Sequence, residues 1–552
     1  MEEESLHWAD QMAREVNERA EKDPILQNVV KKNGYIVYDE KTPSGKIHIG
    51  SGRGWIIHDA VAKSLRNLNL KGRFILSSDD IDPFDKMNKE LPKSFEKYLG
   101  MPFRDIPSPV KGYKSFAEHY FMQCVEKFEE FGIDAEIEST GKRYDDGDFN
   151  TTIKIALDNA DRINAIYERL YGKAPDKLPF NPVCEKCGRI GTTQAYEWDS
   201  DKEVLKYRCK KDLVKWAEGC GHEGELSPYD GNGKFPWKIE WAAKWPTVGA
   251  VCELAGKDHF TQGGARTMAV AVSDEIFDYP PPYPSTRKST GKGYEFFTVG
   301  GRKMSTSKGE GMGFAEATEY VPAPILRYLL VATRPNAVID FDPVNRNDLI
   351  LLYERFDKSE RVYFGKEEIT NEHDIQKHKR IYELAHVGKL PKSMPPQISL
   401  GFAAVLIQST LTVEKAIQRL KEMDYIPDKL SKEDVVYINE RLHFAEKWVR
   451  EYAPEQYKFQ LQEKVSAEVK KSLDEKQKEA LKALIKTLGA KKWDEKELHN
   501  EFYSLSEKTG LDPKEFFRAA YLVLIGKERG PKLANFILTL GKEKAIKVLE
   551  QI

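Results

Sequence analysis

This sequence of 552 residues offers no disulfide framework, no membrane span and no strong net charge. It holds six cysteines, too few for a disulfide scaffold in a chain of this length. No run approaches the ~20 apolar residues that a membrane helix needs, so we expect no membrane partner. The opening Met1-Glu2-Glu3-Glu4 is acidic where a secretory signal is basic and then apolar, which predicts a cytoplasmic protein. Because the formal net charge is only −2, any nucleic-acid binding must depend on local basic patches.

The length and composition instead indicate a large globular protein. A chain of 552 residues exceeds the size of one hydrophobic core, so we expect about three domains. Charged residues make up 32% and apolar residues 40%, as in ordinary globular proteins. No long heptad run indicates a coiled-coil contact, and we expect a monomer.

The N-terminal part has the pattern of a strand, a crossover helix and a second strand. An apolar run at 35–38 leads through a Pro/Gly-rich loop into a helical segment at 50–68, and a buried strand follows at 73–78. This order begins a parallel sheet, so we predict an α/β fold with a Rossmann-type doubly wound sheet.

Two loops have the composition of anion sites. The loop before the 50–68 helix leaves free backbone N–H groups at a helix N-terminus. There Gly45 and Gly50 let the backbone approach a ligand, and His48 adds a donor for a phosphate. The second loop, at 300–311, is flanked by glycines and carries three cations and three hydroxyls. Taken alone, such a loop is typical of a flexible solvated segment.

A family resemblance is carried by three stretches, namely Thr42-Pro43-Ser44-Gly45-Lys46-Ile47-His48-Ile49-Gly50, Ala255-Gly256-Lys257-Asp258-His259 and Lys303-Met304-Ser305-Thr306-Ser307-Lys308-Gly309. The first and third resemble the paired ATP signatures of class I aminoacyl-tRNA synthetases. The second, with its surroundings, resembles the archaeal-type class I lysyl-tRNA synthetase. Further similar runs are Ser78-Asp79-Asp80-Ile81-Asp82, Tyr294-Glu295-Phe296-Phe297 and Arg334-Pro335-Asn336.

The resemblance implies a two-step reaction. The carboxylate of lysine attacks the α-phosphate of ATP to give lysyl-adenylate and pyrophosphate, and the 3′ end of lysine tRNA then takes the lysyl group. Positioning and electrostatics should supply the catalysis, with Mg²⁺ sharing the phosphate charge. The catalytic residues carried over are His48, Gly50, Lys303, Ser305 and Lys308. The ATP-binding residues carried over are Thr42, Pro43, Ser44, Gly45, His48, Gly50, Ser51, Lys303, Met304, Ser305 and Ser307.

Lysine recognition needs an apolar wall for the stem and a carboxylate or aromatic face for the ammonium, because an unpaired buried charge is very costly. The segment at 237–241 offers such groups, Trp237, Glu240 and Trp241, within one extended stretch. The resemblance places Thr42, Trp237, His259 and Tyr294 in the lysine pocket. The carboxylate that pairs with the ammonium stays open between Glu240 and the Asp79/Asp80 pair.

Four of the cysteines are close together in the sequence. Cys184 and Cys187 have the spacing of a zinc knuckle, and Cys209 and Cys220 follow, with His222 just beyond. Tetrahedral zinc takes thiolate and imidazole ligands at such spacings. We therefore predict a structural Zn²⁺ held by Cys184, Cys187, Cys209 and Cys220, with His222 as the alternative fourth ligand. Free reduced cysteines are the competing interpretation.

These patterns divide the chain into domains. We expect an N-terminal helical segment at 1–30 and a Rossmann-type catalytic domain at 31–90 and 235–300. An insertion at 91–234, with a zinc module at 180–226, interrupts the catalytic domain. The loop with the second ATP signature and a helical connecting domain follow at 301–370, and an all-helical domain occupies 371–552. The resemblance implies that the last domain binds the anticodon on aromatic and arginine faces. Its candidate surface residues are Trp448, Arg450, Tyr452, Arg518 and Arg529. A scaffolding or dimerising domain is the alternative.

Two other functions are weighed against lysine activation. A glutamyl-type class I synthetase would need a cationic pocket, and no arginine stands in the segments around Trp237 or Tyr294. The other alternative is an inactive paralogue that binds RNA or adenylate, because Ser51 and Thr306 depart from the class signatures. The presence of His48, Lys303 and Lys308 argues against that loss of chemistry.

Overall fold

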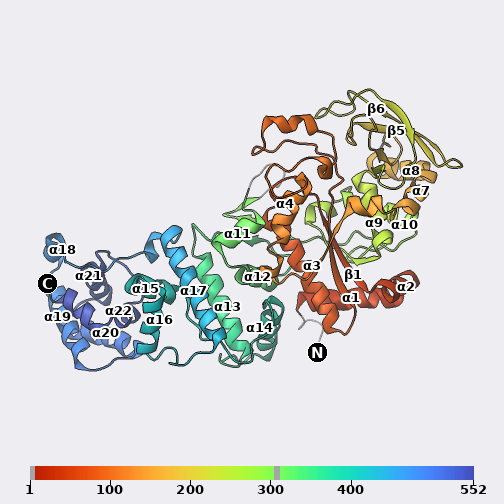
Figure 1. The fold of residues 1–552 in the computed structure, drawn as a ribbon. Coiled ribbons are helices and arrows are strands. Elements are labelled where there is room, and N and C mark those ends of the chain that lie inside the picture. Colours follow the sequence, from red (N-terminus) through yellow and green to blue (C-terminus); the bar gives the residue numbers. More distant parts are fainter. Residues whose placement is uncertain (1–6, 304–310) are drawn as a thin grey trace. The chain divides into compact units, whose positions relative to one another are not determined.

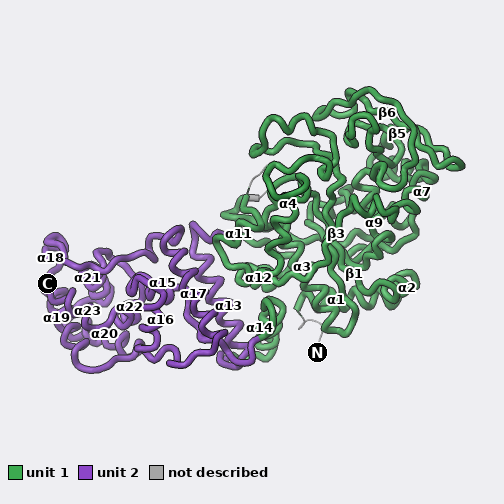
Figure 2. Tube along the Cα trace, in the orientation of Figure 1, with its two compact units in different colours: residues 1–341, 369–390 green, residues 342–368, 391–552 purple. Residues whose placement is uncertain are grey.

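The computed structural model describes residues 7–303 and 311–552. The chain divides into two compact units, which Figure 2 shows in separate colours. Unit 1 comprises Met1–Phe341 and Ile369–Leu390, and unit 2 comprises Asp342–Glu368 and Pro391–Ile552.

A four-stranded parallel sheet lies at the centre of unit 1 (Figure 1). Its strands, in the order β3-β2-β1-β9, are β3 (Glu136–Ser139), β2 (Gly72–Ser78), β1 (Tyr35–Lys41) and β9 (Ala250–Cys252). The pairing of β1 with β2 runs from Tyr35 opposite Gly72 to Lys41 opposite Ser78. The carboxyl ends of these two strands therefore finish level at one edge, where open α/β sheets bind their ligands.

Helices cover both faces of this sheet. Helix α3 (Ile49–Asn67) connects β1 to β2, and α9 (Trp237–Val248) precedes β9. Successive side chains of a strand point to opposite faces. Asp39 of β1 approaches His58 of α3, while its neighbour Glu40 contacts Lys244 of α9. The two helices therefore pack on opposite faces.

The other helices of unit 1 surround this core. They are α1 (Trp8–Lys22), α2 (Pro24–Asn33), α4 (Phe116–Val125), α5 (Phe128–Phe131), α6 (Thr140–Asp145), α7 (Asn150–Asp158), α8 (Ala160–Tyr171), α10 (Ala265–Glu275), α11 (Phe314–Tyr320), α12 (Ala323–Ala332) and α14 (Glu372–Ala385). Three small sheets complete the unit. They comprise β4 (Asn181–Pro182) with β8 (Gly233–Lys234), β5 (Thr193–Asp199) with β6 (Val204–Cys209) and β7 (Glu223–Leu226), and β11 (Arg302–Lys303) with β10 (Phe297–Val299) and β12 (Ile339–Asp340).

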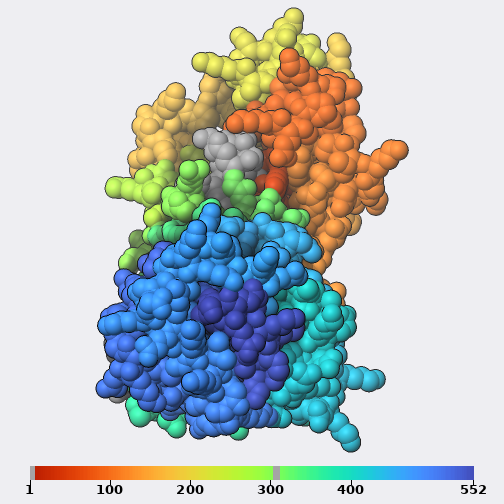
Figure 3. Space-filling view, turned by 90° about the vertical axis from the view of Figure 1, so that its left-hand side faces the viewer, coloured from red at the N-terminus to blue at the C-terminus, as the bar shows by residue number. Residues whose placement is uncertain are grey.

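Unit 2 is helical, and its described residues contain no strand. Its helices are α13 (Asp348–Tyr363), α15 (Leu400–Thr410), α16 (Val413–Glu422), α17 (Lys432–Glu451), α18 (Ala467–Ser472), α19 (Glu475–Ala490), α20 (Glu495–Thr509), α21 (Pro513–Ile525), α22 (Leu533–Leu540) and α23 (Lys542–Leu549). In Figure 3 the dark blue C-terminal helices lie between the cyan and the lighter blue segments of this unit. Trp448 is only 1% exposed, so its expected place on the surface is wrong, because the indole packs against Tyr457 in the interior.

Most of the elements expected in the catalytic half are confirmed. The segments at 35–38, 50–68 and 73–78 correspond to β1, α3 and β2. The expectation that 237–241 is extended is wrong, because these residues form the first turns of α9. Pro236, in an extended conformation, immediately precedes the helix. Tryptophan and isoleucine favour strands in isolation, but burial of Ile239 and Glu240 on one face of a helix prevails here.

No single helix among the described residues combines the length and apolar composition of a membrane span; the pair Leu400–Thr410 and Val413–Glu422, which meet at 108°, reaches them only when taken together.

Candidate active site

A cavity of about 910 Å³ opens where β1 ends and α3 begins. The residues predicted from the sequence that line it are Thr42, Ser44, His48, Gly50, Ser51, Asp79, Trp237, Glu240, Trp241, His259 and Tyr294. Pro43 and Gly45 belong to the same loop but do not line the cavity. Four predicted residues lie outside the described part of the chain, namely Met304, Ser305, Ser307 and Lys308. Lys303 is the last residue of strand β11. Strand β11 pairs with β10, which begins at Phe297, a residue that lines the cavity.

The first ATP signature runs beside the segment that follows the second one. The amide of Ile49 donates to the carbonyl of Met312 (3.0 Å), and the amide of Phe314 donates to the carbonyl of Ile47 (2.8 Å). These two bonds fix His48 at the position just before α3. The first turn of α3, with Gly50 and Ser51, therefore faces the cavity as a helix N-terminus that can bind an anion.

Aromatic side chains form one wall of the cavity. The rings of Trp237 and Trp241 stack with centroids 6.2 Å apart, and His259 stands edge-on to Trp241 at 5.4 Å. The indole N–H of Trp241 donates to Glu253 (2.7 Å), which also accepts from Arg266 (2.6 Å). This wall is therefore held in place from behind by a buried ion pair, since Arg266 is fully buried.

Tyr294 stands on the α3 side of the cavity, in a segment held by Arg53. The Arg53 guanidinium donates to the carbonyls of Glu295 (2.7 Å) and Ala337 (2.7 Å), and also to those of Phe296, Arg334 and Pro335. A methyl group at Gly54 would lie 2.6 Å from the Tyr294 hydroxyl and 3.4 Å from Oδ2 of Asp39. Glycine at this helical position thus lets Tyr294 come close to α3.

Beneath the cavity, two lysines are enclosed by carboxylates. The Lys234 ammonium contacts Asp79 (3.0 Å), Asp82 (2.8 Å) and Glu240 (3.0 Å). The Lys244 ammonium contacts Glu240 (3.0 Å) and Glu40. Glu240 also accepts from the hydroxyl of Tyr144 (2.8 Å). Both lysine side chains are at most 3% exposed, so the charges of this network compensate one another away from water.

The network has more carboxyls than ammoniums, and burial and charge together set the pKa values of its acids. Burial raises the pKa of Glu40 to about 8, although Lys244 opposes the shift. Burial likewise raises the pKa of Asp82 to about 7 against the pull of Lys234. For Asp79, burial would raise the pKa, but the ammoniums of Lys234 and Lys244 bring it below the usual value.

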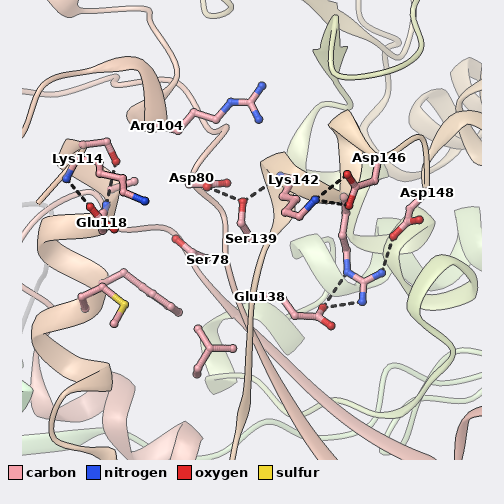
Figure 4. A pocket seen from close by; sticks show the side chains of 16 residues that line it. Ser78, Asp80, Arg104, Lys114, Glu118, Glu138, Ser139, Lys142, Asp146 and Asp148 are labelled. Carbon is pink, nitrogen blue, oxygen red and sulfur yellow. Dashed lines mark hydrogen bonds and ion pairs between the residues drawn. The ribbon is translucent and has the colours of Figure 1, made fainter.

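The two acids that follow β2 point into different cavities. Asp79 lines the active-site cavity, whereas Asp80 lines a second one of about 770 Å³ (Figure 4). There its carboxylate accepts from the hydroxyl of Ser139 (2.6 Å) and the amide of Gly141 (2.8 Å). The sequence analysis made Asp80 a candidate partner of the lysine ammonium, but Asp80 does not line the active-site cavity.

Several residues that shape the site escaped the sequence analysis, among them Asp39, Arg53, Lys234, Lys244 and Arg266. A signal existed for Lys244, because it follows Glu240 by four residues, which is the spacing of an ion pair on a helix. Interpreting 237–241 as extended removed that signal. The carbonyls that hold Arg53, and two of the three carboxylates around Lys234, lie more than 150 residues away in the sequence, where no local pattern indicates them.

The four clustered cysteines converge in space. The sulfurs of Cys184 and Cys220 are 3.6 Å apart, and those of Cys187 and Cys209 are 3.7 Å apart. All four sulfurs lie within 4.8 Å of one another. The cluster found among the described residues does not include His222, whose ring lies near Glu185 (3.9 Å). These four thiols can thus hold one metal ion.

Comparison with known proteins gives two family matches and many relatives. The model described as tRNA synthetases class I (K) matches residues 6–388, and that of an anticodon binding domain matches residues 437–552. A lysine–tRNA ligase of Methanosphaera stadtmanae is 33% identical over 98% of this chain and 99% of its own. One from Methanocaldococcus jannaschii is 32% identical, with the same coverage. A solved glutamate tRNA ligase from Elizabethkingia meningosepticum, 13% identical, covers 94% of this chain and 98% of its own with a TM-score of only 0.41.

Proposed function

The chain belongs to the class I tRNA synthetase (K) family, and we propose that it is a lysine–tRNA ligase. In the first step the carboxylate of lysine attacks the α-phosphate of ATP, so that lysyl-adenylate forms and pyrophosphate leaves. In the second step a hydroxyl of the terminal ribose of lysine tRNA attacks the lysyl carbonyl, and AMP leaves.

One observation carries the choice of amino acid, namely the charge of the cavity. Its lining includes the carboxyl groups of Asp39, Glu40, Asp79, Asp82, Asp85, Glu240, Glu253, Asp258 and Glu295. Among the described lining residues there is no arginine, and Lys41 is the only lysine. The nearby Arg53 and Arg266 are occupied by backbone carbonyls and by Glu253. Such a pocket attracts a cationic side chain and repels the carboxylate of glutamate.

The chemistry needs no protein nucleophile, so we assign each residue a positioning or electrostatic role. The N-terminus of α3 at Gly50 and the imidazole of His48 would hold the phosphates of ATP. Lys303, Ser305 and Lys308 would stabilise the charge that develops on the pyrophosphate as it leaves. Thr42 would border ATP and lysine alike, while Trp237, His259 and Tyr294 would pack against the lysine stem.

Mg²⁺ would enter this site with ATP and share the charge of its phosphates. Three acids of the cavity have carboxylate oxygens close enough to share a metal ion, namely Glu40, Asp79 and Glu240. They do not suit a permanently bound ion. Their carboxylates already surround the ammoniums of Lys234 and Lys244.

We further propose that Cys184, Cys187, Cys209 and Cys220 hold a structural Zn²⁺. Tetrahedral Zn–S bonds of about 2.3 Å place sulfurs about 3.8 Å apart, close to the separations of 3.6 and 3.7 Å here. The hydroxyl of Thr192 and the amide of Cys220 also lie 3.2 and 3.3 Å from the Cys209 sulfur, as suits a thiolate.

For the helical unit we propose recognition of the lysine tRNA anticodon. The match of residues 437–552 to an anticodon binding domain supports this role. Arg450 is exposed and Arg518 is half-buried, and we keep both as candidates for stacking on bases. We also propose the domain boundaries that the sequence predicts, with 371–552 as the anticodon-binding domain. We propose that the protein acts as a monomer.

Lysine-dependent exchange of pyrophosphate into ATP tests the function. We expect exchange with lysine and none with glutamate, and a loss of about 10²–10³-fold in His48→Ala because one stabilising donor is removed. His373→Ala, on the exposed surface of α14, is the matched control and should keep full activity. Assays with and without lysine tRNA separate an enzyme that needs RNA from an inactive protein. Silence in both conditions, or exchange with glutamate, would overturn the proposal.

A further inference from the structure

Most carboxyl groups of the active-site cavity are already in contact with protein cations. Glu40, Asp79, Asp82 and Glu240 contact Lys234 or Lys244, Glu253 contacts Arg266, and Glu295 contacts Lys257. The sequence candidates Glu240 and Asp79 are therefore committed to internal ion pairs, and Asp80 lies in the other cavity (Figure 4). A substrate ammonium has to find its partner elsewhere.

Within the described residues, the lining carboxylates with no lysine or arginine within 4 Å are Asp39, Asp85 and Asp258. Asp85 and Asp258 are exposed to water, where an ion pair contributes little. The side chain of Asp39 is only 17% exposed. A charge that meets Asp39 is thus largely shielded from solvent, which strengthens the attraction.

The basic side chain nearest to Asp39 cannot neutralise it. The Nδ1 atom of His58 lies 3.6 Å from Oδ2 of Asp39. That nitrogen donates to the carbonyl of Gly54 (2.7 Å), while Nε2 accepts from the amide of Leu254 (2.9 Å). With one nitrogen donating and the other accepting, the ring is held neutral, and burial lowers the pKa of His58 to about 4.

Taken together, these contacts lead us to infer that Asp39 binds the side-chain ammonium of the lysine substrate. This inference rests on the proposed function. Asp39 and the hydroxyl of Tyr294 both border Gly54, so an aromatic wall for the stem stands beside the carboxylate.

The depth of Asp39 selects the side-chain ammonium over the α-ammonium. Gly54 lies four residues beyond Gly50 in α3, which corresponds to about 6 Å along the helix axis. Gly50 belongs to the turn that faces the ATP phosphates, where the carboxylate of lysine must react. A group about 6 Å deeper matches the far end of an extended lysine side chain rather than its α-carbon.

Several groups around Asp39 affect the charge of its carboxyl group. The groups around Asp39 are the backbone amide of Glu40, Lys41 on the same face of the strand, His58, Glu253 and Tyr294. Burial raises the pKa of Asp39 well above its usual value. A bound ammonium favours the carboxylate form and lowers that pKa again.

Asp39→Asn in the full-length enzyme tests the inference, with lysine-dependent exchange as the assay. We expect the KM for lysine to rise at least 100-fold while the KM for ATP stays within threefold. Asp80→Asn is the matched control and should leave the KM for lysine unchanged. If Asp80→Asn weakens lysine binding and Asp39→Asn does not, the assignment is wrong.

Two lysine analogues distinguish binding from mere structural support. The compound 6-aminohexanoate keeps the side-chain ammonium, and norleucine keeps only the α-ammonium. As competitors of lysine, 6-aminohexanoate should lose affinity in Asp39→Asn and norleucine should not. The reverse result would assign Asp39 to the α-ammonium, and equal losses would show a structural role; either overturns the inference. A wild-type enzyme silent with lysine would instead refute the proposed function itself.

Discussion

Lys244 reaches Glu240 across one turn of α9, with the ammonium 3.0 Å from Oε2, and the same ammonium contacts Glu40 on β1. The Lys244 ammonium thus joins α9 to β1, one of the two inner strands of the sheet, and the side chains of Lys244 and Glu240 are at most 3% exposed. Such a pair stabilises the fold weakly while intact, but its disruption is costly because the partner charges stay behind.

We expect Lys244→Met to destabilise the protein by about 3–5 kcal/mol, the usual cost of breaking a buried ion pair. Thermal unfolding would measure the effect. Lys22→Met removes an exposed lysine of a helical surface pair and should change stability by less than about 0.5 kcal/mol. Equal and small effects in both variants would show that the buried network is not held by Lys244.

Stability should fall as pH rises from 5 to 8, in part because of Glu40. Its pKa is about 8 in the folded protein against 4.5 for the free group, so the folded state keeps a proton that the unfolded chain loses. The folded state then binds more protons, and each such group lowers the free energy of unfolding by up to about 1.4 kcal/mol per pH unit. Asp82, with its pKa near 7, adds to the slope below pH 7.

Glu40→Gln tests this relation, since the amide does not titrate. The variant should lose less stability between pH 5 and 8 than the wild type, in urea unfolding measured at each pH. Glu138→Gln offers a comparison, because Glu138 ends up paired with Arg143 outside the active-site network. A steeper decline in Glu40→Gln would contradict the proposed proton.

Arg53→Lys should loosen the segment that carries Tyr294. Lysine keeps the charge but cannot reach carbonyls on both segments, and we expect a loss of about 2–4 kcal/mol in stability from the carbonyls left unpaired. The KM for lysine should rise more than the KM for ATP, because we propose that Tyr294 packs against the lysine stem. Exchange kinetics at varied concentrations of lysine and of ATP would measure the two KM values separately. An unchanged KM for lysine would show that Arg53 does not position Tyr294.

The purified protein should contain one zinc per chain, measured by elemental analysis. Cys209→Ala should lose the metal, because it removes one of four converging thiolates. His222→Ala is the informative control, and it should keep the metal, since the ring lies outside the cluster found among the described residues. If His222→Ala loses zinc and Cys220→Ala retains it, the fourth ligand is His222 rather than Cys220.

Local patterns in the sequence sufficed for the strand–helix–strand core and the helical unit. The apolar run at 35–38, the glycine-containing loop after it and the mostly buried helix α3 are signals that depend on neighbouring residues only. The cysteines at 184 and 187 belong to the same class of signal, because a two-residue spacing already fixes their chemistry.

The sequence by itself determined a parallel α/β unit, a loop that leads into a helix N-terminus, a cluster of four cysteines and a helical unit. Only the tertiary structure decided which charges are available to a ligand. Lys234 meets Asp79 across 155 positions of sequence, and Lys244 meets Glu40 across 204. Charge pairing in a buried site depends on distance in space and on exclusion of water, and neither leaves a trace in residue spacing. For that reason the sequence made Glu240 and Asp79 candidates for binding the lysine ammonium, although protein lysines already contact them. Asp39 could be recognised as a candidate only from the tertiary structure.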